Sequence, residues 1–62
     1  MSELVKRVAS ASRLLTLAEN SLWRAKEILI DIEDFSSIAK RIGEICSEIR
    51  EINQRLKLRV GR

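Results

Sequence analysis

The sequence predicts an all-α fold: a two-helix antiparallel hairpin with coiled-coil-like heptad seams, completed to a helical bundle by a second copy or a larger protein. The 62-residue chain contains no proline and only two glycines, which is typical of uninterrupted helix. Apolar residues recur at alternating spacings of three and four along nearly the whole chain. The phase of this pattern changes once, near the middle, where a hairpin needs its turn.

The first predicted helix covers about residues 3–29. Its seam follows alternating spacings of four and three residues, and every position of the seam is apolar. The seam residues are Leu4, Val8, Ala11, Leu15, Ala18, Leu22, Ala25, Leu29 and Ile32. Ala11, Ala18 and Ala25 form an alanine stripe, and small residues let a neighbouring helix approach closely. That neighbour is either the second helix of the same chain or the first helix of another chain.

The second predicted helix covers about residues 32–59. Its seam consists of Phe35, Ile38, Ile42, Ile45, Ile49, Ile52 and Leu56. The step from Ile32 to Phe35 to Ile38 breaks the heptad phase, which indicates a turn at about residues 30–34 or, alternatively, local overwinding of one long helix. We favour the turn, with Asp31 as the N-cap of the second helix; Asp34 and Ser36 are the alternative positions for this boundary, because the turn contains no glycine or proline. Residues 1–62 then form a single helical-hairpin domain.

The small size of the chain predicts association with another chain. A lone core of this size is only marginally stable, because little of the surface of so short a chain can be buried. Cys46 is the only cysteine and histidine is absent, so neither an internal disulfide nor a tetrahedral zinc site is expected. No apolar run is long enough to span a bilayer, and the N-terminus lacks the pattern of a secretory signal. We therefore expect a soluble, cytoplasmic protein.

Apolar side chains outside the seams point to the first helix as a protein interface. The second helix is mainly charged or polar outside its seam, and one partner helix cannot cover both flanks of the first. An exposed apolar patch of this kind usually marks an interaction surface. The predicted interface residues are Val5, Leu14, Leu17, Trp23, Ile28 and Ile30.

Basic residues concentrate near both ends of the chain, whose net charge is +3. A hairpin brings these ends together, and such a cluster can contact nucleic-acid phosphates without reading the sequence. Alternatively, the bases near the C-terminus of the second helix compensate its dipole. The candidate contact residues are Lys6, Arg7, Arg13, Arg55, Lys57, Arg59 and Arg62.

Catalytic chemistry is not indicated. The chain has no histidine or tyrosine, no glycine-rich phosphate loop and no recognisable pair of catalytic carboxylates. Cys46 lies beside the second seam, where a small buried hydrophobe is expected rather than a nucleophile. We expect no enzymatic activity, no catalytic residue, no cofactor, no metal and no small-molecule substrate.

In length, hairpin layout and alanine-containing heptads, the chain resembles the Rop family of plasmid copy-number proteins. Their hairpins dimerise into four-helix bundles and bind paired RNA loops. No residue motif is shared, so no RNA-contacting residue is carried over. The first hypothesis is an accessory subunit that docks through its first helix in a nucleic-acid-processing assembly. The others are a Rop-like homodimer that binds RNA or DNA directly, and a purely structural oligomerisation module.

Overall fold

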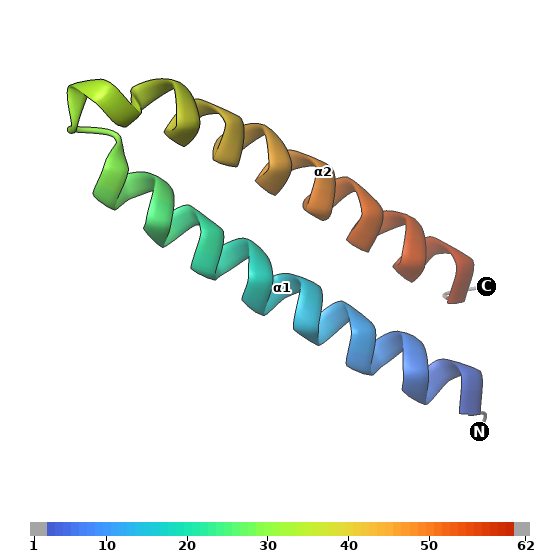
Figure 1. Cartoon of the computed structure of the whole chain (residues 1–62). Coiled ribbons are helices and arrows are strands. Elements are labelled where there is room, and N and C mark those ends of the chain that lie inside the picture. Colours follow the sequence, from blue (N-terminus) through green and yellow to red (C-terminus); the bar gives the residue numbers. More distant parts are fainter. Residues whose placement is uncertain (1–2, 61–62) are drawn as a thin grey trace.

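The computed structural model describes residues 3–60, which form two long helices joined by a short connection (Figure 1). Helix α1 spans Glu3–Leu29 and helix α2 spans Ser36–Val60, with a 3-10 helix, η1, at Glu33–Phe35. The two α-helices run antiparallel and pack against each other, and no strand occurs in the described part of the chain. The predicted all-α hairpin is confirmed, and a single long helix is excluded.

The connection is made by backbone hydrogen bonds. The Ile32 N–H donates to the Leu29 carbonyl at 3.0 Å, and the Phe35 N–H donates to the Ile32 carbonyl at 2.9 Å. Ile32 is the N-cap of η1, with extended backbone angles and no side-chain cap. The prediction of Asp31 as the N-cap was therefore wrong, because the turn satisfies these backbone groups without it. Helix α2 begins only at Ser36, after the 3-10 turn.

The helices meet along a line of residues beside the predicted seams. Ser12 faces Asn53, and Glu19 faces Cys46, with hydrogen bonds across each pair. Cys46 and Asn53 are buried, as is Ala39 one heptad earlier. We call this row of contacts the interhelix line. It is partly polar, whereas the seams are apolar.

Within the hairpin, the residues of the predicted seams fall into two rows that differ in burial. One row of seam residues lies beside the interhelix line and is half-buried: Val8, Leu15, Leu22, Leu29, Ile42, Ile49 and Leu56. The other row lies one step further around each helix: Leu4, Ala11, Ala18, Ala25, Ile38, Ile45 and Ile52. Most of this second row is exposed, including Ala11 and Ala18 of the alanine stripe. Helix α2 of the same chain therefore leaves Ala11 and Ala18 of the stripe uncovered, whereas Ala25 is half-buried.

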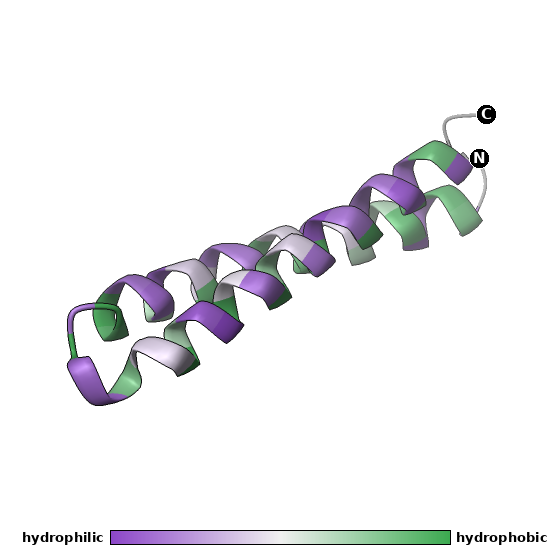
Figure 2. Ribbon diagram, turned by 90° about the horizontal axis from the view of Figure 1, so that it is seen from above, coloured by the Kyte–Doolittle hydropathy of each residue, from purple (hydrophilic) through white to green (hydrophobic). Residues whose placement is uncertain are grey.

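The hairpin has a very small interior. Among residues 3–59, the buried apolar side chains are Ala39 and Cys46. Apolar segments instead recur along both helices, interleaved with hydrophilic ones (Figure 2). Burying one Leu or Ile side chain contributes roughly 1.5–3 kcal/mol, so the exposed residues represent more hydrophobic stabilisation than the interior supplies.

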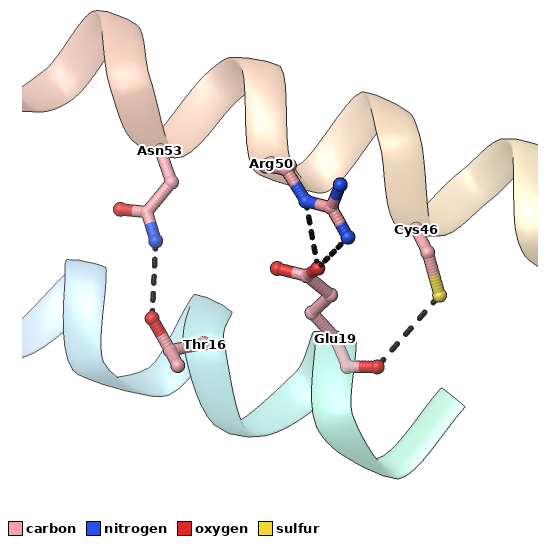
Figure 3. Close-up of polar contacts among 5 residues, drawn as sticks. All are labelled: Thr16, Glu19, Cys46, Arg50 and Asn53. Atoms are coloured by element: carbon pink, nitrogen blue, oxygen red, sulfur yellow. Dashed lines mark hydrogen bonds and ion pairs between the residues drawn. The ribbon is translucent and has the colours of Figure 1, made fainter. Parts of the chain in front are cut away.

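A ladder of polar contacts fixes how the helices align (Figure 3). The Asn53 amide donates to the Thr16 hydroxyl at 3.1 Å, and the Ser12 hydroxyl donates to Asn53 Oδ1 at 2.6 Å. The Arg50 guanidinium donates twice to Glu19 Oε2, at 2.9 and 2.6 Å. A buried amide whose partners lie on the other helix favours one alignment, because sliding the helices would leave it unsatisfied.

Asn53→Asp is expected to lower the free energy of unfolding by about 1–3 kcal/mol, because a carboxylate cannot donate to Thr16 and is buried where an amide fits. Chemical denaturation measures this change. Gln54→Glu, the same amide-to-carboxylate change at the next, exposed residue, is the control and should be nearly neutral. Equal stability of the two variants would contradict a register-setting role for Asn53.

Candidate protein interface

The second row of seam residues forms one continuous apolar surface, which we call the open face. In each helix these residues lie on the far side of the half-buried row from the interhelix line. Because the helices are antiparallel, the two sets fall on the same side of the hairpin. Leu4, Ile38 and Ile52 are 65%, 49% and 51% exposed, and the half-buried row forms the floor between them. The open face thus has the apolar composition of the core of a helical bundle, but no second layer of helices covers it in the hairpin.

The flank of α1 extends this surface. Leu14 is 65% exposed and Ile28 is 72% exposed. Leu14 lies three residues after Ala11 and four before Ala18, so these side chains share one side of the helix. Leu17, three residues after Leu14, is also exposed. Three of the predicted interface residues therefore border the open face.

Trp23 and Ile30 lie on the opposite side of the hairpin. They line a shallow hollow near the turn, together with Lys26 and Gly43. Lys26 Nζ lies 4.2 Å from the centroid of the Trp23 ring, an attractive cation–π arrangement. A Cβ at Gly43 would lie 3.2 Å from the same Nζ atom, so the glycine leaves room for this lysine. Val5, the remaining predicted interface residue, is exposed in the first turns of α1.

The flank of α2 is charged, and the pattern begins in η1. Four exposed residues recur every seven positions, and we call them the charged rim: Asp34 of η1, and Arg41, Glu48 and Arg55 of α2. Arg41, Glu48 and Arg55 lie three residues after Ile38, Ile45 and Ile52, so the rim borders the open face. Arg41 also pairs with Glu44 along the helix at 3.1 Å. The open face is therefore bounded by apolar residues on α1 and by alternating charges on α2.

The basic candidates gather at the open end of the hairpin but not on one face. The described candidates, Lys6, Arg7, Arg13, Arg55, Lys57 and Arg59, are exposed, and Arg62 lies outside the described residues. Both chain ends lie at this end (Figure 1). Arg55 and Arg59 flank a hollow with Ile52 and Leu56, whereas Lys57 lies beside Gln54 and Leu58. Arg7 is paired with Glu3 at 3.3 Å.

Sequence reasoning missed the interhelix line. It treated Ala39 and Cys46 as residues beside a seam and did not consider the polar residues Ser12 and Asn53 as internal contacts. The available signal was a second heptad row in α2, Ala39, Cys46 and Asn53, which is small or uncharged at every position. Small residues at a heptad position permit close helix packing, and this row locates the contact with α1.

Within residues 3–60, no three acidic or cysteine side chains lie together so that they could hold a metal ion. No described helix is long and apolar enough to cross a membrane. Comparisons with protein-family models, curated proteins and solved structures found no match to this chain.

Proposed function

We propose that this chain is a non-enzymatic, cytoplasmic interaction module that docks onto protein through the open face and the adjoining α1 flank. One observation carries the proposal: the described apolar residues that are buried are the small Ala39 and Cys46, whereas large apolar side chains of the open face and the α1 flank are exposed, namely Leu4, Leu14, Leu17, Ile28, Ile38 and Ile52. Exposed apolar surface on this scale is typical of an interaction site. The α1 flank was predicted from the sequence, and the open face adds the isoleucines of α2.

Docking would contribute to the stability of the hairpin as well as to recognition. A chain this small lacks the core needed to fold securely alone. Docking on the open face would bury leucine and isoleucine side chains on both helices, with roughly 25 cal/mol gained for each Å² removed from water. Folding and binding are then coupled, and the module reaches its stable form in a complex.

A two-tag co-purification experiment tests the proposal. Tagged chain is co-expressed with a differently tagged copy in its native cell, and both self-association and bound proteins are quantified. Leu14→Glu and Ile52→Glu, one on each helix, should each reduce association at least about tenfold because they place a charge at the apolar contact. Gln54→Glu adds the same charge outside the open face and should have little effect. Unchanged association in all three variants would overturn the proposal.

The basic open end supports a second candidate function, weak contact with nucleic acid. Lys57 and Arg59 lie in the last turn of α2, with Arg55 just before them, and the start of α1 adds Lys6 and Arg7 beside them. Such a cluster attracts phosphates by counterion release and gives no sequence specificity. Neutralising Arg55, Lys57 and Arg59 to glutamine should reduce the salt dependence of binding to a random duplex while preserving helicity. Absence of binding at low salt would leave dipole compensation as their role.

A further inference from the structure

We infer that the occupant of the open face is a second copy of this chain, placed by a two-fold axis perpendicular to the helices. In this arrangement α1 packs on α1 of the second copy and α2 packs on α2, both antiparallel, to form a four-helix bundle. The inference rests on the proposed function, because it names the partner of that same surface. The charged rim and the α1 flank support it separately.

When two copies of the charged rim run antiparallel to each other, positive residues of one copy can face negative residues of the other. The signs of the rim alternate from Asp34 in η1 through Arg41 and Glu48 to Arg55 in α2. If two antiparallel α2 helices meet with their midpoint between residues 44 and 45, Asp34 faces Arg55 and Arg41 faces Glu48 of the second copy. Symmetry repeats both contacts, so every rim residue meets an opposite charge. Sliding by one heptad instead opposes Arg41 with Arg55, or Asp34 with Glu48, and such like-charge contacts select against those registers.

The register chosen by α2 also aligns α1. Ser12 faces Asn53 and Glu19 faces Cys46 within the hairpin, so the level of residues 44–45 in α2 corresponds to residues 20–21 in α1. Leu14 then lies within one residue of the level of Ile28 of the second copy, and Ser21 lies within one residue of the level of its own counterpart. Leu14 and Ile28 are among the most exposed apolar residues of the hairpin. Their mutual burial follows from a register that was chosen by charge alone.

The other two-fold arrangement fits poorly. An axis parallel to the helices would place α1 on α2 of the second copy at the levels already set within the hairpin. At those levels Leu14 would lie between Glu48 and Arg55, and Ile28 would lie between Asp34 and Arg41. The apolar flank of α1 would then meet the charged rim.

The contact between the two copies is concentrated in the part of the hairpin nearest the turn. In the inferred register, residues 12–29 of α1 and 36–53 of α2 face their counterparts. The basic ends project at opposite poles, where one duplex does not readily reach both.

Cysteine cross-linking tests this geometry. In a Cys46→Ser background, Ser21→Cys places a thiol beside the inferred axis, and Asn20→Cys places one at the same level on the outer side of α1. A short bismaleimide should convert most of the Ser21→Cys protein to covalent dimer while Asn20→Cys stays monomeric. Equal cross-linking at both positions, or at neither, would overturn the inferred arrangement.

A charge-reversal cycle provides an independent readout, the dimer dissociation constant from sedimentation equilibrium. R41E and E48R should each raise this constant about tenfold, because each turns two symmetry-related attractive contacts into repulsive ones. The R41E/E48R double variant restores opposite charges across the interface and should return the constant close to that of the wild type. Additive weakening in the double variant would contradict the register.

These outcomes separate the inference from the proposed function. A purified chain that stays monomeric, yet binds another protein in a manner sensitive to Leu14→Glu and Ile52→Glu, overturns the second-copy inference and leaves the docking function intact. If the chain is monomeric and its binding to other proteins is unchanged by Leu14→Glu and by Ile52→Glu, the second-copy inference and the docking function are both overturned.

Discussion

A hundredfold dilution of the purified chain should lower its thermal unfolding midpoint by about 10 °C, since the free energy of a dimer falls by about 2.7 kcal/mol over that range. The reason is the small interior: with Ala39 and Cys46 as its described buried apolar residues, the separated hairpin has little to hold it folded. Unfolding and dissociation then occur together, and mass action moves the midpoint. Circular dichroism at several concentrations measures this shift.

The covalent dimer formed through Ser21→Cys is the control for this experiment. Once the two copies are linked, unfolding becomes unimolecular, so its midpoint should not depend on concentration and should exceed that of the free chain. A midpoint of the free chain that is independent of concentration would show that the hairpin is stable alone. That result would remove the coupling of folding to association.

Ala18→Glu should abolish association, raising the dissociation constant at least about a thousandfold, because a buried unpaired carboxylate costs several kcal/mol. Ala18 is exposed in the hairpin and lies near the middle of the open face. The substitution therefore adds a charge without disturbing the described interior. By symmetry two carboxylates enter a dimer interface, which doubles the effect.

Ala9→Glu is the matched control. Ala9 lies on the same helix and is also exposed, but it is on the side of the hairpin opposite the open face. An isolated hairpin would tolerate both substitutions equally, since both add one charge to an exposed alanine. The expected outcome is dissociated or unfolded Ala18→Glu protein and an Ala9→Glu protein that associates like the wild type. Equal association of the two variants would contradict the assignment of the open face.

The sequence predicted the hairpin because its evidence was periodic and redundant. Many apolar positions had to agree in phase, and the single break at Phe35 fell in the connection. The prediction of Asp31 as the N-cap was wrong because it relied on residue type alone. In the turn, the N–H groups of Ile32 and Phe35 donate to backbone carbonyls and need no side-chain cap. Local side-chain preference is a weaker constraint than a repeated pattern.

The distribution of the seam residues between the two surfaces could not be predicted from periodicity. A heptad seam identifies apolar residues on one side of a helix, but two adjacent rows within it can face different neighbours. Here the row with Leu15 lies beside the interhelix line, while the row with Ala18 faces outward. Rotation of each helix is set by the small and polar contacts of Cys46 and Asn53, which apolar periodicity does not register.

The solution mass of the purified wild-type chain, measured by sedimentation together with its helicity at the same concentrations, tests the central claim most directly. We expect a helical species of twice the 7.1 kDa chain mass, with helicity lost as the species dissociates. A fully helical 7.1 kDa monomer that persists at all concentrations would contradict it.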